Sequence, residues 1–128
     1  MGFVNRRNSY RIPVQMFLNE YVADTPYRCM SANISPSGLY LNRLLQPVER
    51  PSPVVGLEFE LPGTSELIWA RGEVRYDTFD PYFHGTGVKI TGIALAHQRL
   101  LRDYVLETRA EQLRKLLALV RRNRMRWH

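Results

Sequence analysis

The sequence predicts a mainly β protein, a small antiparallel β-barrel of six strands followed by one long C-terminal helix. Short apolar runs separated by Pro, Gly, Asn and Asp fill residues 10–92, and a run without Gly or Pro follows over residues 95–126. Short strands joined by turns favour an antiparallel sheet, and closing a small sheet into a barrel protects its edges. With 128 residues, 45% of them hydrophobic, a single domain over residues 1–128 can bury a core.

Six apolar runs have the composition or the alternation of β-strands. In the first run, Ile12, Val14 and Met16 recur at every second position, which is the period of a strand with one buried face. Prolines at 47, 51 and 53 indicate an irregular link between the third and fourth runs. The six expected strands are residues 11–18, 27–34, 39–41, 54–61, 67–76 and 87–90.

The C-terminal helix is expected from about residue 94 to residue 124, because Ala, Leu, Arg and Glu dominate there. Leu100, Leu101, Tyr104 and Val105 are expected to pack against the barrel. A helix over residues 95–122 is roughly 40 Å long at 1.5 Å per residue. Since that length is about twice that of a typical strand, the helix should extend beyond the barrel.

The far half of this helix carries an apolar seam, which we define by residues that recur at alternating spacings of four and three over 106–120. This is the a/d pattern of a coiled coil, although about two heptads are fewer than the three or four that identify one. The seam predicts a protein partner or self-association, and the alternative is that it folds back on the chain's own core. Its residues are Leu106, Ala110, Leu113, Leu117 and Val120.

The net charge of +6 is concentrated at the two ends of the chain. Residues 1–12 contain three arginines and no acid, and residues 93–128 contain nine basic and three acidic residues. Arginine predominates over lysine, which favours bidentate contacts with phosphate or carboxylate. Nucleotides, nucleic acids and acidic protein surfaces therefore all remain as partner classes. The basic cluster over 121–126 is either a solvated tail or a contact for an acidic protein, nucleic acid or anionic lipid.

Other features exclude several classes of protein. No apolar run approaches the roughly 20 residues of a membrane span, and the polar N-terminus does not resemble a secretory signal. We therefore expect a cytoplasmic protein without a transmembrane segment. Cys29 lies in an apolar run and has no second cysteine to pair with, so a buried reduced thiol is expected.

The sequence contains no set of residues that predicts an enzyme, a metal site or a cofactor. His84, His97 and His128 lack the spacing of metal ligands, and His84 is interpreted as a loop residue. Asp77 and Asp80 are interpreted as turn residues. The segment Gly85-Thr86-Gly87 is interpreted as a turn into the last strand, because no helix follows it as in a phosphate-binding loop.

Two short polar signatures near the start of the chain predict a nucleotide-binding surface. Arg6, Arg7 and Arg11 form the pattern R-R-x-x-x-R, and residues 33–38 form N-x-S-x-x-G. The arginine spacing recurs twice elsewhere in the chain, so the distant second pattern is what makes the pair informative. Guanidinium groups bind phosphate and guanine, and a short Asn/Ser/Gly turn supplies donors and acceptors at close range.

The arginines lie ahead of and at the edge of the first expected strand, in an N-terminal segment that we call the leader. The leader is expected to fold over a ligand held against the barrel and to become ordered when the ligand binds. Asn33 offers an amide, Ser35 offers a hydroxyl, and Gly38 permits a positive φ or a close backbone approach. The alternative for these three residues is simple turn formation.

These residues together resemble the PilZ domain family over roughly residues 6–106. In that family, an R-x-x-x-R leader and a D/N-x-S-x-x-G turn on a small β-barrel bind the bacterial second messenger cyclic di-GMP. Residues 85–90 are similar to the family's final-strand G-x-G-V-x-F signature, with Ile90 in place of the aromatic residue. Asn33 stands where Asp is commoner in the family.

The resemblance implies a PilZ-type barrel and a cyclic di-GMP receptor that is not an enzyme. Arg7 and Arg11 would hold phosphates and guanine edges, and the residues of the turn, Asn33, Ser35 and Gly38, would line the opposite wall. Arg6 is similar to the extra arginine of members that bind an intercalated ligand dimer, so one or two ligands per chain remain alternatives. A second function left open is a nucleotide-independent module that uses the basic helix to bind protein or, less favoured, nucleic acid.

Overall fold

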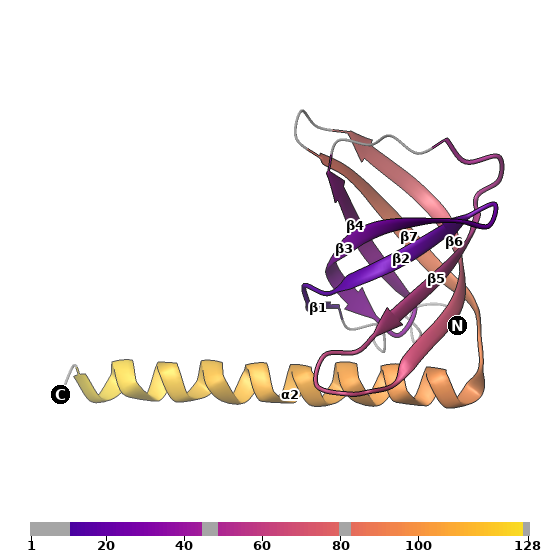
Figure 1. Cartoon of the computed structure of the whole chain (residues 1–128). Coiled ribbons are helices and arrows are strands. Elements are labelled where there is room, and N and C mark those ends of the chain that lie inside the picture. The colour runs from indigo at the N-terminus through magenta and orange to yellow at the C-terminus, as the bar shows by residue number, and fades with distance from the viewer. Residues whose placement is uncertain (1–10, 45–48, 80–82, 127–128) are drawn as a thin grey trace, which may run out of the picture.

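The structure is a computed structural model that describes residues 11–44, 49–79 and 83–126. Over those residues the chain forms seven strands and one helix (Figure 1). In chain order they are β1 (Ile12–Pro13), β2 (Phe17–Val22), β3 (Thr25–Ser35), β4 (Gly38–Leu44), β5 (Val54–Glu60), β6 (Leu67–Phe79), β7 (Phe83–Ile93) and α2 (Leu95–Arg126).

Six of the strands form a closed barrel in the order β3-β2-β5-β6-β7-β4, and β4 pairs back with β3. Every neighbouring pair is antiparallel. The short strand β1 lies outside this ring and pairs with β3 through Ile12 and Ile34. The predicted class, a mainly β fold with a six-stranded antiparallel barrel and a long C-terminal helix, is confirmed.

The first expected strand, residues 11–18, is broken in two. β1 ends at Pro13 and β2 begins at Phe17. Between them, the Ser31 hydroxyl replaces part of the backbone hydrogen bonding of the strand. It donates a hydrogen bond to the Val14 carbonyl and accepts one from the Met16 N–H at 3.1 Å. Because Ile12, Val14 and Met16 all stay buried, their alternation does not reveal the break.

The segment Gly85-Thr86-Gly87 lies inside β7 and is not a turn, which corrects the expectation from the sequence. The physical reason is aromatic packing. A Cβ atom at Gly85 would overlap the Tyr40 hydroxyl, and one at Gly87 would overlap the ring of Tyr76. The two glycines therefore make room on β7 for rings that come from β4 and β6.

The barrel encloses an apolar core, and α2 contributes to this core at its N-terminal half. Leu101 and Val105 are fully buried, and Leu100 and Tyr104 pack on the core at its edge, as expected from the sequence. The contributing barrel residues come from every strand of the ring, and they include Leu18, Ile34, Leu39, Leu57, Phe59 and Ile68. The core thus fixes the direction in which the rest of α2 leaves the barrel.

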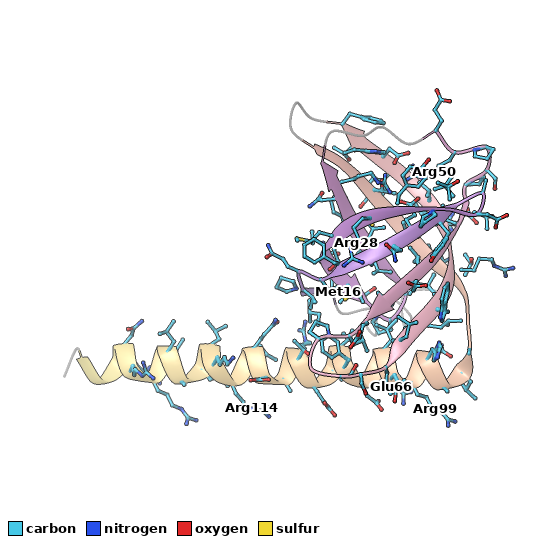
Figure 2. All side chains as sticks on the ribbon, in the orientation of Figure 1. Met16, Arg28, Arg50, Glu66, Arg99 and Arg114 are labelled. Carbon is cyan, nitrogen blue, oxygen red and sulfur yellow. The ribbon has the colours of Figure 1, made fainter. Side chains whose placement is uncertain are left out.

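The C-terminal half of α2 projects beyond the barrel (Figure 1). In Figure 2, Arg99 lies beneath the barrel and Arg114 lies beyond it, as the length of the helix predicts. Within the described ranges, no helix is both long and apolar enough to cross a membrane.

Cys29 is buried in β3, as expected, and its thiol lies 3.7 Å from the Leu18 carbonyl. Burial raises the pKa of the Cys29 thiol to about 12, against a smaller opposing effect of the nearby Arg43 charge. The thiol therefore stays protonated at physiological pH, which makes it a poor nucleophile.

Candidate functional site

The N-x-S-x-x-G signature forms the hairpin turn between β3 and β4. Ser35 ends β3 and pairs with Gly38, the first residue of β4. The Ser35 hydroxyl accepts hydrogen bonds from the N–H groups of Ser37 and Gly38, at 3.3 and 3.1 Å, and lies 3.2 Å from the Gly38 carbonyl. Because Ser35 has no exposed surface, its hydroxyl serves to build the turn.

Gly38 is needed because two strands approach closely at this turn. A Cβ atom at position 38 would lie 2.5 Å from the carbonyl oxygen of Val88. In addition, the Ile90 N–H donates a hydrogen bond of 2.8 Å to the Ser37 carbonyl. The turn is therefore held against β7, and its exposed rim has a fixed position.

The structure brings the first signature to the second through Arg11 and Asn33. The Arg11 Nη1 donates a hydrogen bond of 3.1 Å to the Asn33 Oδ1, although the two residues are 22 apart in the chain. Asn33 pairs with Pro13 of β1 on one side and with Tyr40 of β4 on the other. The other two arginines of the signature, Arg6 and Arg7, lie outside the described residues.

A cleft of about 250 Å³ opens beside this turn. Its lining contains three basic side chains and no carboxylate, so it favours an anionic ligand. Two of the three, Arg75 and Lys89, come from β6 and β7, whereas Arg11 directly precedes β1. The lining residues are Arg11, Ser37, Gly38, Arg75, Tyr76, Gly87, Val88 and Lys89.

Tyr76 gives the cleft an aromatic wall. Its side chain is 49% exposed, and its ring lies over Gly87 and contacts the Tyr40 ring at a centroid distance of 6.0 Å. A half-exposed ring in a cleft lined by cations offers a surface on which a planar base can stack. Arg75 is oriented by an ion pair of 3.3 Å with Glu73.

Three of the lining residues, Arg75, Tyr76 and Lys89, were not expected from the sequence. They come from strands that are distant in sequence from the two signatures and meet them only when the barrel closes. One signal was available, since the pair Gly85 and Gly87 within an apolar run indicates that bulky side chains approach β7 closely.

A second polar cluster lies inside the barrel, where Glu20 has no exposed surface and forms ion pairs with Arg43 and Arg50. Figure 2 shows Arg50 at the end of the barrel that is away from α2. The Arg50 Nη1 also lies 2.9 Å from the Asp77 Oδ1, so the cluster links β2, β4 and β6. Its opposite charges are paired with one another, and we assign it to the stability of the fold.

Asp77 and His84 belong to this cluster, which corrects their interpretation as turn and loop residues. His84 is only 3% exposed and lies on β7, with its Nε2 2.6 Å from the Asp77 Oδ1. Thr86 donates a hydrogen bond of 2.9 Å to the same oxygen. Burial alone would raise the pKa of Asp77, but these hydrogen bonds and the Arg50 charge outweigh it and lower that pKa. Asp80 lies outside the described residues.

The site offers cations, an aromatic face and fixed backbone groups, a set that suits a nucleotide. In the described part of the chain, no group of three or more His, Cys, Asp or Glu residues is placed to hold a metal ion. The guanidinium groups of Arg11 and Arg75 and the ammonium group of Lys89 line the same cleft, so together they favour an anion there.

Comparison with protein families and solved structures agrees with the fold described above. The family model of the PilZ domain matches residues 5–107. The sequence matches no curated protein at a significant level.

Three solved structures illustrate the likeness in fold. The Bacillus subtilis inhibitor of motility MotI/DgrA is 20% identical with a TM-score of 0.73, over 83% of this chain and 52% of its own. The PilZ domain of Escherichia coli YcgR with c-di-GMP is 15% identical with a TM-score of 0.60, over 87% of this chain and 97% of its own. The MrkH–c-di-GMP complex of K. pneumonia is 15% identical with a TM-score of 0.65, over 86% and 55%. The chain thus spans about half the length of MotI/DgrA and of MrkH.

Proposed function

Because the chain belongs to the PilZ domain family, we propose that it is a receptor for cyclic di-GMP. The observation that carries this proposal is the 3.1 Å hydrogen bond between Arg11 and Asn33, which joins the two signatures at the edge of a basic cleft. The structures of YcgR and MrkH that share the fold contain this ligand. A cyclic dinucleotide presents two phosphates and two guanine bases, which match the guanidinium groups and the aromatic ring of the cleft.

Within the site, the signature residues have different tasks. Arg11 and Asn33 bind the ligand directly, through its phosphates and a guanine edge, and Arg6 and Arg7 approach it from the leader. Ser35 and Gly38 act through the turn, because the buried Ser35 hydroxyl and the tight backbone at Gly38 set the position of its rim. In addition to the signatures, Arg75, Tyr76 and Lys89 line the same cleft and are proposed to contact the ligand.

The ligand signals by ordering the leader. The leader enters the fold at β1, a strand of two residues that contacts both β3 and α2 (Figure 1). A ligand held by Arg6, Arg7 and Arg11 therefore fixes the chain directly beside the barrel–helix junction. We expect this ordering to change how the junction and the projecting part of α2 contact a protein partner.

The energetics are sufficient for a signalling affinity. Each hydrogen bond to a charged group contributes about 1.5–3 kcal/mol, and a micromolar dissociation constant corresponds to about 8 kcal/mol. Three or four arginine contacts together with base stacking reach that value.

Titration calorimetry with cyclic di-GMP tests the proposal. We expect micromolar binding by the wild-type chain, with a stoichiometry that distinguishes one ligand from two, and a loss of affinity in Arg7→Ala and Arg11→Ala. Arg28→Ala is a matched control, because Arg28 is an exposed arginine on β3 whose guanidinium lies 5.0 Å from the Phe17 ring centroid, away from the cleft residues. Absence of wild-type binding at tens of micromolar ligand would refute the proposal.

A further inference from the structure

The apolar seam is exposed on the projecting part of α2. Leu106, Leu113, Leu117 and Val120 are 46%, 46%, 57% and 47% exposed. At about 100° per residue, the seam is centred about 120° around the helix axis from Leu101 and Val105, which are buried against the barrel. The barrel therefore occupies a different face of the helix and does not cover the seam.

We infer that the seam binds the seam of a second copy of this chain, with the two helices antiparallel. This inference rests on the proposed function, and it identifies the protein partner of α2 as a second copy of the chain. In an antiparallel coiled coil, each a residue faces a d residue of the other helix. One register then places Leu113 against the second copy's Leu117 and Ala110 against its Val120. The two-fold symmetry of the dimer forms each of these contacts twice. Every seam residue from Ala110 to Val120 therefore meets an apolar partner.

Charge favours an antiparallel pair over a parallel one, and in this register the only like-charged contact of the flanking positions is Arg114 opposite the second copy's Arg114. The same alignment brings Glu107 beside the second copy's Arg121, and the two-fold axis produces that ion pair twice. Leu106 faces the aliphatic stem of the second copy's Arg124, whose charged end reaches water. In a parallel dimer, by contrast, Asp103 would face Asp103 and Arg124 would face Arg124, two pairs of like charges at core positions.

The shape of the molecule also suits an antiparallel pair. The barrel packs on the N-terminal half of α2, and most of the seam lies on the half that projects from it (Figure 1). Antiparallel helices place the two barrels at opposite ends, where they do not compete for space. The contact is short, about 21 Å along residues 106–120 at 1.5 Å per residue, so we expect a weak dimer that depends on protein concentration.

Sedimentation equilibrium on the full chain without ligand tests the association. We expect a monomer–dimer equilibrium, and Leu113→Glu should weaken the dimer at least about tenfold because it would bury a charge. Leu119→Glu is the matched control, since Leu119 is 53% exposed but lies on the barrel side of the helix. Circular dichroism verifies that both variants fold. A wild-type chain that stays monomeric at several hundred micromolar overturns the inference.

Disulfide trapping tests the direction of the helices. An equimolar mixture of Ala110→Cys and Val120→Cys proteins is oxidised and its disulfide dimers are weighed by mass spectrometry. The antiparallel register predicts the mixed dimer, because residues 110 and 120 of the same helix are about 15 Å apart along the axis. Dimers of each variant with itself, or no disulfide dimer, overturn it. Cys29 does not interfere, because it is buried and its pKa is raised to about 12.

Charge reversal gives an independent check of the register. Glu107→Arg and Arg121→Glu should each weaken the dimer by about tenfold across its two ion pairs, and the double variant should recover the affinity. Failure of the double variant to recover rejects this register. Titration of cyclic di-GMP into the same samples distinguishes failure of the dimer from failure of the proposed receptor function. A dimer that does not bind the ligand refutes only the receptor function, and a monomer that binds the ligand refutes only the dimer.

Discussion

Arg11 and Asn33 are joined by a hydrogen bond of 3.1 Å between the guanidinium Nη1 and the amide Oδ1, across 22 residues of sequence. One of the five N–H donors of Arg11 thereby fixes the side chain at the rim of the cleft. The bond is exposed, so its net contribution to stability is about 0.5–1.5 kcal/mol at most. A ligand phosphate can therefore replace the Asn33 oxygen, or bind other N–H groups of Arg11 beside it, at little cost in free energy. In the absence of ligand, the hydrogen bond keeps the Arg11 side chain in a position where it can bind an anion.

Tyr76 should contribute to ligand affinity through its ring. We expect Tyr76→Ala to weaken cyclic di-GMP binding by about 5- to 150-fold, since stacking of one base is worth about 1–3 kcal/mol. Tyr76→Phe is the matched control and should keep near wild-type affinity, because it retains the stacking face. Both are measured by titration calorimetry, and equal affinities for the Ala and Phe variants would show that the ring does not contact the ligand.

Gly38 should be important for stability as well as for the shape of the site. A Cβ atom at position 38 would lie 2.5 Å from the Val88 carbonyl oxygen, a backbone atom that cannot move without disturbing β7. We expect Gly38→Ala to lower the free energy of unfolding by about 1–3 kcal/mol, the usual range for overpacking. In Gly92→Ala, the control, the nearest atoms belong to the flexible Arg71 side chain, at 3.2 Å or more. Urea denaturation compares the two, and a Gly38→Ala protein as stable as the control contradicts the prediction.

The sequence predicts this fold well because its main signals are local. Alternation and turn residues identify strands wherever one face is buried, and the run without Gly or Pro identifies α2. The break in the first strand was missed because the Ser31 hydroxyl, fifteen or more residues away, replaces part of its backbone pairing. A period of two in the side chains carries no information about which backbone groups are paired.

The candidate site was only partly predictable for the same reason. Arg11 and Asn33 were found because each belongs to a short contiguous pattern. Tyr76 belongs to no pattern, and Lys89 stands at the variable position of the pattern over residues 85–90. Both reach the cleft through the pairing of β6 with β7, whose register shifts between Val74 and Tyr76. His84 was interpreted wrongly because its partner Asp77 becomes adjacent only when these two strands pair.

Glu20 should be among the charged residues on which stability most depends. It has no exposed surface and accepts hydrogen bonds from Arg43 and Arg50. Glu20→Gln leaves two buried guanidinium groups without that charge, so we expect a loss of about 3–5 kcal/mol in the free energy of unfolding. Glu58→Gln is the control, because Glu58 lies at the surface of β5 and bonds only partly buried groups, Asn19 and Tyr21. Equal losses in the two variants, measured by urea denaturation, would show that burial of Glu20 is not what matters.

Asp77 should make stability depend on pH in acid. Its pKa is lowered below the ordinary value of 3.8, because hydrogen bonds from His84 and Thr86 and the charge of Arg50 together outweigh the opposing effect of burial. A carboxyl group with a lowered pKa in the folded state stabilises the protein fully above its unfolded-state pKa, and this contribution is lost as the pH falls through the folded-state pKa. We therefore expect Asp77→Asn to be less stable than the wild type at pH 7, with the difference shrinking as the pH falls below 3.8. Urea denaturation of both proteins from pH 7 to the lowest pH at which they fold measures this difference, and a difference that is constant or grows in acid would contradict the assignment of Asp77 to the cluster.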